Sequence, residues 1–251
     1  MRANVIAGRE LRSLFLSPLA WAILAIVQLI HAYLFLIGVD QYLQIQGQLS
    51  MIEGAPGVTD LIIGQLFASA GFILTLVVPL ITMRLISEER RARTLTLLFS
   101  APLSAFEIVL GKFLGVCAFL AAMLALLAAM ALSLGLGTTL DLGVVASGLL
   151  GLALMLMAFA AIGLYLSSVT SYPAVAAIST FGVLLLLKII DLATSADVTQ
   201  PGLLSYLSMQ HHFNNLLRGS FNSSDVVYYL LLTGLFLALS VRRLEAERLQ
   251  S

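Results

Sequence analysis

The chain has 251 residues, of which 60% are hydrophobic and 10% are charged, and its formal net charge is zero. About 25% of the residues in ordinary soluble domains are charged, so this composition excludes a water-soluble protein. A neutral chain also lacks the basic excess that favours nucleic-acid binding, and no nucleic-acid partner is expected. The sequence therefore points to a protein whose solvent is the lipid bilayer.

Six apolar stretches are candidates for membrane-spanning helices, each of which needs about 20 mostly apolar residues. These stretches lie at about 19–39, 61–83, 105–134, 143–167, 173–190 and 226–241. The connections between them are too short to fold alone, so the sequence predicts one transmembrane domain over residues 1–251. The predicted fold class is an all-α integral membrane protein with six transmembrane helices, an N-terminal interfacial helix and a short cytoplasmic helix.

Residues 1–18, before the first span, have the periodicity of an amphipathic helix. Apolar side chains such as Leu11 fall on one face and arginines such as Arg9 fall on another. Such a segment can lie in the membrane interface, or it can be a cytoplasmic extension of the first span. Because proline interrupts the helical hydrogen bonds, we expect the interfacial helix to end near Ser17 and Pro18.

Two polar side chains, Gln28 and His31, interrupt the first span. They are one helical turn apart and therefore share a face, which should point away from lipid because unpaired polar groups are costly there. Two explanations remain open. These residues line a substrate path or a protomer interface, or they form hydrogen bonds with a neighbouring helix.

The connection between the second and third spans gathers five charged side chains into the six residues from Glu88 to Arg93. We predict a helix over residues 88–100, because Ser87 can cap its start and the two glutamates favour a helix N-terminus. Pro102 marks its end. This helix would be charged at its beginning and apolar towards its end.

Ion pairs within the predicted 88–100 helix are also expected. Glu88 and Arg91 are three residues apart, and Glu89 and Arg93 are four apart, which suits side-chain pairs on a helix. The helix could lie on the membrane, with its arginines at acidic headgroups and apolar residues such as Phe99 facing inward. An exposed helix with anchored ends could equally transmit movement from a cytoplasmic motor.

The third external connection, near residues 191–225, is the longest, and its section 201–221 is expected to form re-entrant or interfacial short helices. His211 and His212 are adjacent there, so their rings should point in different directions. A structural role is favoured over a metal site, since no third ligand lies nearby in the sequence. No metal site is predicted elsewhere.

Basic residues are concentrated on one side of the predicted topology. With six spans, eleven of the thirteen Lys and Arg residues fall on the side of the two termini, and only Lys188 and Arg218 fall on the other. The positive-inside rule therefore predicts that both termini are cytoplasmic.

Motifs of catalysis are absent from the sequence. The Walker pattern fails because Lys112 follows Gly111 but is itself followed by Phe113. A zinc-protease motif and a nucleophile elbow are also missing. We therefore expect no enzyme activity in this chain, and any ATP must be bound by another subunit.

The run EERRARTLTLLFSAPLSAFEIVLGKFLG resembles the Glu-x-x-x-x-Thr-Leu-x-x-Leu-x-x-x-Pro region of ABC-2-type permeases, particularly their gliding-motility and nitrous-oxide-maturation branches. The matching residues are Glu89, Thr94, Leu95, Leu98 and Pro102. The C-terminal stretch is similar to that of the gliding-type permeases, with Phe213, Arg218, Gly219, Asp225 and Tyr229 in a similar order. The resemblance covers nearly the whole chain.

This resemblance implies a permease subunit, expected to be part of an exporter in a bacterial inner membrane. Its partners would be cytosolic ABC ATPases, which bind ATP and Mg, and a second permease copy or paralogue. An extracytoplasmic accessory protein and membrane lipid are further expected partners. The resemblance leaves the substrate open.

Residue roles follow from the same resemblance. The segment 88–100 would be the coupling helix, and the external region 201–221 would cap the pathway. The implied ATPase-coupling residues are Glu88, Glu89, Arg90, Arg91, Arg93, Thr94, Leu95, Leu98 and Phe99. The implied external gate residues are His212, Phe213, Arg218 and Gly219, and Gln28 and His31 are candidates for the pathway or dimer interface.

Two other classes of protein remain as alternatives. A stand-alone channel or secondary carrier would need no motor and would transport substrate without ATP. Many carriers are built from repeated halves, and the sequence has no persuasive repeat. A membrane enzyme is a more distant third class, because no clustered metal or nucleophile site is evident.

Overall fold

The computed structural model of the chain describes residues 2–49, 51, 57–95, 103–196 and 208–249. The described helices are α1 (Arg2–Leu16), α2 (Pro18–Leu49), α3 (Gly64–Thr82), α4 (Ser87–Arg91), α6 (Ala105–Ser133), α7 (Leu142–Val169), α8 (Pro173–Ala196), α10 (Met209–Leu217) and α11 (Ser223–Arg248). A π-helical turn, Thr59–Ile63, precedes α3, and a 3₁₀ turn, Leu134–Leu136, follows α6. Within these described ranges, six helices are long and apolar enough to cross a membrane, so the predicted all-α membrane fold is confirmed.

Several helices extend beyond the apolar stretches that predicted them. The first span was expected to end near residue 39, but α2 continues to Leu49, where Gln44 donates a hydrogen bond to Asp40 one turn earlier at 2.9 Å. The helix α11 likewise runs to Arg248, beyond the predicted end at Val241. Hydropathy marks the apolar part of a helix, whereas polar turns can continue the same hydrogen-bonding ladder.

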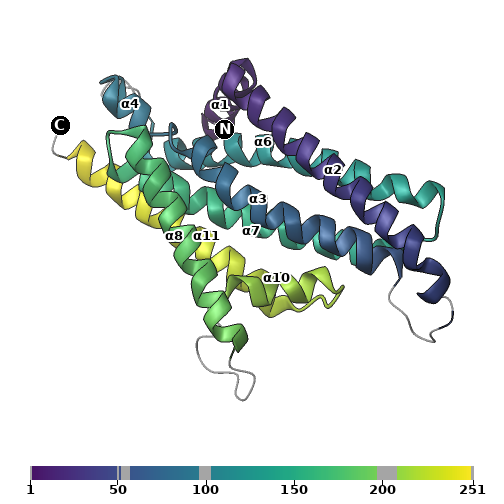
Figure 1. The fold of residues 1–251 in the computed structure, drawn as a ribbon. Coiled ribbons are helices and arrows are strands. Elements are labelled where there is room, and N and C mark those ends of the chain that lie inside the picture. Colours follow the sequence, from purple (N-terminus) through teal and green to yellow (C-terminus); the bar gives the residue numbers. More distant parts are fainter. Residues whose placement is uncertain (1, 50, 52–56, 96–102, 197–207, 250–251) are drawn as a thin grey trace.

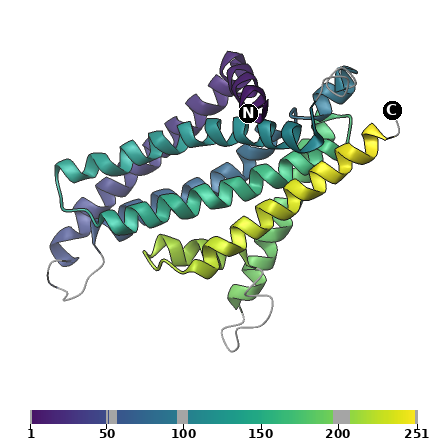
Figure 2. The same cartoon turned by 180° about the vertical axis from the view of Figure 1, so that it is seen from behind.

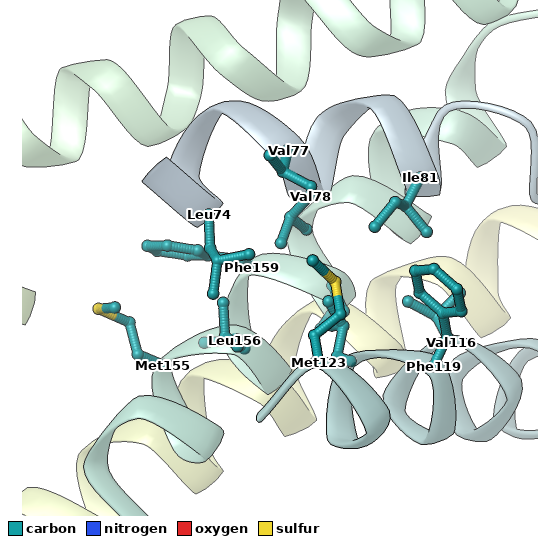
Figure 3. Packing of buried hydrophobic residues seen from close by; sticks show 14 of the residues in the cluster. Leu74, Val77, Val78, Ile81, Val116, Phe119, Met123, Met155, Leu156 and Phe159 are labelled. Carbon is teal, nitrogen blue, oxygen red and sulfur yellow. The ribbon is translucent and has the colours of Figure 1, made fainter. Parts of the chain in front are cut away.

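The core of the bundle forms where α3, α6 and α7 meet. Helix α7 lies centrally and contacts α3, α6, α8, α10 and α11. Seen from behind, α6 and α7 lie side by side, and α11 runs along α7 (Figure 2). Figure 3 shows the interdigitated side chains, which are Leu74, Val77, Val78 and Ile81 of α3, Val116, Phe119 and Met123 of α6, and Met155, Leu156 and Phe159 of α7.

The two ends of the bundle differ in charge. One end, called the basic end below, comprises α1, α4, the start of α6 and the end of α11, and both chain termini belong to it (Figure 1). Ion pairs join these elements, as between Arg90 of α4 and Glu247 of α11. The opposite end holds the connection from α6 to α7 and the short helix α10.

Helix α1 packs against α6 through the small residues of a Gly-x-x-x-Gly pair. A Cβ atom on Gly111 would lie 2.6 Å from Ile6 Cβ and 2.8 Å from the carbonyl oxygen of Ala3. A Cβ atom on Gly115 would lie 2.7 Å from Glu10 Cβ. These glycines let the two backbones approach closely, so the motif serves packing within the protomer.

Replacing Gly111 by Ala is expected to destabilise the protein by about 1–3 kcal/mol, because the added methyl group meets backbone atoms of α1 that cannot move independently. Thermal unfolding of the purified protein in detergent measures the effect. Gly234 of α11 is the matched control, since nothing lies within 4 Å of its added Cβ. Gly234→Ala should be neutral or stabilising, as alanine is the better helix former. Equal responses of the two variants would contradict the close approach of α1 and α6.

Candidate functional site

A buried lysine connects three elements at the basic end. Lys112 of α6 is 1% exposed, and its Nζ lies 2.8 Å from Glu89 Oε1 and 3.4 Å from Glu10 Oε2. Glu89 Oε1 also accepts a hydrogen bond from Arg9 Nη2 at 3.1 Å. The Glu89 carboxylate thus joins α4 to α1 and α6. Its second oxygen, Oε2, is buried without a hydrogen-bond partner.

Arg90 anchors α4 to the last helix. Its guanidinium forms a bidentate pair with Glu247 of α11, in which Nε donates to Oε1 at 2.9 Å and Nη2 donates to Oε2. Next to Glu247, Arg248 Nη1 donates to the carbonyl oxygen of Leu103, just before α6. Bidentate arginine–carboxylate pairs fix both partners in orientation. Movement of α4 is therefore linked to the end of α11.

Ser167 of α7 fixes the junction between α3 and α4. Its Oγ accepts hydrogen bonds from the backbone N–H groups of Ile86 and Ser87, both at 3.1 Å, and donates to the carbonyl oxygen of Met83 at 3.0 Å. Ser87 was predicted to cap the charged helix, but the N-cap is Ile86, and the Ser87 hydroxyl donates back to Met83. A side chain 80 residues away supplies the cap instead.

The charged helix is shorter than the predicted 88–100 segment, because α4 ends at Arg91. Arg93 follows with φ of 55°, in the left-handed region. The N–H of Arg93 bonds the carbonyl of Arg90 at 3.1 Å, and the N–H of Thr94 bonds that of Glu89 at 2.9 Å. These two bonds form a Schellman motif, which ends a helix. Residues 96–102, including the predicted coupling residues Leu98 and Phe99, lie outside the described part.

The remaining coupling residues divide into an anchored group and an outward group. Glu89 and Arg90 form the ion pairs described above, and Leu95 is buried at 4% exposure. The outward residues are Glu88, Arg91, Arg93 and Thr94, whose side chains are exposed. The anchored group joins α4 to the bundle, whereas the outward group is accessible to another molecule.

Gln28 and His31 face the interior of the protomer. Gln28 Nε2 donates to the carbonyl oxygen of Met123 in α6 at 3.1 Å, and His31 is fully buried, with Nδ1 at 2.6 Å from the carbonyl oxygen of Val27. Gln28 Oε1 and His31 Nε2 are buried without hydrogen-bond partners. The contact of Gln28 with α6 matches the neighbouring-helix explanation, and the burial of His31 removes it from the surface that a second copy would contact.

Helix α10 packs along α7 at the opposite end of the bundle. A Cβ atom on Gly151 of α7 would lie 2.8 Å from Leu216 Cβ and 3.4 Å from Phe213, whose ring is fully buried. Gly219, with φ of 75°, lies beside Val144, nearer the start of α7. These contacts extend over about 10 Å of the α7 axis at 1.5 Å per residue. The predicted region 201–221 is thus packed into the bundle over its described residues.

A histidine–carboxylate pair holds α10 to α11. His212 Nδ1 lies 2.6 Å from Asp225 Oδ1, and both side chains are buried. The His212 ring stacks on Tyr228 at 4.3 Å between ring centroids, and Tyr229 donates from its hydroxyl to the carbonyl oxygen of Met209 at 2.7 Å. The other predicted gate residue, Arg218, is exposed at the end of α10. The sequence did not predict the pairing, because 13 residues separate the partners.

Among the residues that the structure describes, no group of three or more His, Cys, Asp or Glu side chains could hold a metal ion. The ion pairs described above connect helices instead. Those at the basic end link α1, α4, α6 and α11, and the His212–Asp225 pair at the opposite end links α10 and α11. The arrangement is suited to transmitting movement between helices.

Comparison with known protein families agrees with this architecture. The model of a family described as "ABC-2 family transporter protein" matches residues 4–249, from the start of α1 to the end of α11. Among curated proteins, none matches the sequence significantly. Proteins of this family are membrane components of transporters, generally work with a cytosolic ABC ATPase and often dimerise. The chain belongs to the ABC-2 transporter family and is the membrane subunit of an ABC transporter.

Proposed function

We propose that this chain is the permease of an ABC exporter and that α4 receives the movement of its ATPase. The main support for this proposal is that the residues of α4 divide into an anchored group and an outward group. Glu89 and Arg90 connect α4 to α1, α6 and α11, while Glu88 and Arg91 are exposed. A force applied to the outward side would reach α1, α6 and α11 through these ion pairs.

The orientation of the chain in the membrane is part of this proposal. The basic end would face the cytoplasm, as the positive-inside rule requires, with both termini on that side of a bacterial inner membrane. ATP and Mg would be bound by the ATPase. A second permease copy or paralogue would complete the pathway, and the His212–Asp225 pair would hold α10 as part of an external gate. The resemblance of its sequence to the gliding-motility and nitrous-oxide-maturation branches supports placing this chain near those two branches within the family.

The proposal is tested by exchanging the outward charges of α4. The double variant Glu88→Arg with Arg91→Glu keeps the net charge but reverses the charge pattern that a partner would contact. We expect binding of the partner ABC ATPase to weaken about tenfold or more, since mismatched charges at an interface cost several kcal/mol. Binding is measured by surface plasmon resonance on the permease in nanodiscs.

The matched control exchanges Arg243 and Glu245 of α11, which are also exposed at the basic end. Arg243→Glu with Glu245→Arg should leave ATPase binding unchanged. Unaltered binding of the α4 variant would overturn the assignment of α4 as the docking element. Substrate flux through liposomes that contain this chain alone, without ATP, would overturn the exporter proposal itself.

A further inference from the structure

A cavity of about 390 Å³ lies at the basic end, between α1, α2, α3, α4 and α6. Its volume is in the range of roughly 300–1,000 Å³ that small-molecule sites occupy. One part of its wall is apolar and includes Ala20 and Ile23 of α2 and Leu80 and Ile81 of α3. The other part is charged and belongs to α1, α4 and the junction after α3. The cavity is therefore amphipathic.

The charged residues of the lining balance one another. The basic ones are Arg9, Arg84 and Lys112, and the acidic ones are Glu10, Glu88 and Glu89. Most of this charge is already engaged, since Lys112 contacts Glu89 and Glu10, and Arg9 contacts Glu89. The charged groups of a ligand would therefore interact mainly with the lining residues that take no part in these pairs.

Three charged groups remain outside these pairs, namely Arg84, Glu88 and the second carboxylate oxygen of Glu89. Arg84 forms no ion pair with any residue that the structure describes, although it lines the cavity. Glu89 Oε2 is buried without a hydrogen-bond partner, while Oε1 of the same carboxylate accepts from Arg9 and Lys112. A buried carboxylate oxygen without a donor is unfavourable, so a rotation of the Glu89 carboxylate towards a ligand that supplies an N–H group would satisfy it.

We propose that this cavity binds the headgroup of a zwitterionic phospholipid that carries a primary amine. The phosphate would pair with Arg84, and the ammonium would donate to Glu89 Oε2 and to Glu88. The apolar wall formed by Ile23, Leu80 and Ile81 would contact the first methylene groups of the acyl chains. The cavity lies where charged residues of α1, α4 and the junction after α3 meet apolar surfaces of α2 and α3, as expected at the depth of headgroups in a bilayer.

The chemistry of the lining discriminates among headgroups. A choline headgroup has the same net charge, but its quaternary nitrogen has no N–H group to donate to Glu89. A glycerol headgroup also offers a phosphate to Arg84, but it has no ammonium to neutralise Glu88 and Glu89. An ethanolamine headgroup supplies both an anion for Arg84 and an N–H donor for the carboxylates. The cavity shares Glu88 with the proposed ATPase contact of α4, but binding of the lipid requires neither the ATPase nor the exporter function.

Native mass spectrometry of the full chain, released from detergent micelles, tests the proposal. The probes are phosphatidylethanolamine, phosphatidylcholine and phosphatidylglycerol with identical acyl chains. We expect phosphatidylethanolamine to bind about tenfold more tightly than either of the others, because hydrogen bonds to charged groups are the stronger ones. Equal binding of phosphatidylethanolamine and phosphatidylcholine would overturn the proposal. Soluble phosphoethanolamine is the fourth probe, and binding as tight as that of the lipid would overturn the lipid as ligand.

Arg84→Gln and Glu88→Gln locate the site. Both side chains are exposed and neither belongs to the Lys112 network, so both variants should fold, as their thermal unfolding will verify. Arg84→Gln is expected to weaken the binding of all three lipids, because each carries a phosphate, whereas Glu88→Gln is expected to reduce the preference for phosphatidylethanolamine. The matched controls Arg243→Gln and Glu245→Gln, exposed on α11 at the same end, should retain it. If the Arg84 variant binds the three lipids as tightly as the wild type but loses binding of the ATPase, the cavity is a protein contact and the proposal fails.

Discussion

Replacing Lys112 by Met is expected to destabilise the protein by about 3–5 kcal/mol, the usual effect of removing one partner from a buried ion pair. Lys112 is 1% exposed and neutralises Glu89 at 2.8 Å and Glu10 at 3.4 Å. Methionine fills a similar volume, so the loss reports the charge and not a cavity. Thermal unfolding in detergent, followed by size-exclusion chromatography of the heated samples, measures the effect.

Two further variants separate burial from charge. Arg9→Met removes another cationic partner of Glu89, but the Arg9 side chain is 58% exposed, so the loss should stay within about 1 kcal/mol. The double variant Lys112→Met with Glu89→Gln removes both members of the closest pair. It should be more stable than Lys112→Met alone, because a buried pair replaced as a whole is often tolerated. A Lys112→Met protein as stable as the wild type would contradict the network.

The six spans could be predicted from the sequence because membrane insertion depends on local composition. A run of about 20 apolar residues needs no knowledge of its neighbours to be recognised. The helix ends were less predictable, as α2 shows by continuing through Asp40 and Gln44 to Leu49. The packing of Gly111 and Gly115 against α1 likewise depends on tertiary contacts that local composition does not reveal.

The ion pairs of the charged segment could not be predicted from its local sequence. The spacing predicted pairs within the helix, such as Glu89 with Arg93, and these are the pairs that sequence distance can suggest. The structure instead joins Arg90 to Glu247, 157 residues away, and Lys112 to Glu10, 102 residues away. Such contacts depend on the packing of α1 and α11 against the bundle. For the same reason the sequence indicated Lys112 as one more basic residue on the cytoplasmic side and did not predict its burial.

For the two histidines of α10, the sequence predicted that the rings point in different directions, but it did not predict the partner of the buried ring. Adjacent residues were expected to point in different directions, and His211 is exposed whereas His212 is buried. The spacing could not reveal that the buried ring would meet Asp225, which the sequence indicated only as one of the residues in a similar order to the gliding-type permeases. This difference between neighbours provides a matched pair of substitutions.

His212→Ala is expected to destabilise the protein by about 3 kcal/mol, whereas His211→Ala should change the stability by no more than about 0.5 kcal/mol. Without the His212 ring, Asp225 Oδ1 loses its partner at 2.6 Å, and Oδ2 is already buried without one. The carboxyl group would then be buried with neither oxygen satisfied, and Tyr228 would lose its stacking partner. Thermal unfolding of both variants in detergent gives the comparison.

The double variant His212→Phe with Asp225→Leu decides whether the pair matters through its polarity or through its volume. It keeps an aromatic ring against Tyr228 and removes both buried polar groups, so it should recover much of the stability that His212→Ala loses. If α10 acts as an external gate, the same variant would be stable yet altered in ATP-driven transport, because the polar link between α10 and α11 would be gone. Equal stability of the His211→Ala and His212→Ala proteins would show instead that the pair does not hold α10 in place, and the gate would have to depend on the apolar contacts of Phe213 and Leu216 with α7.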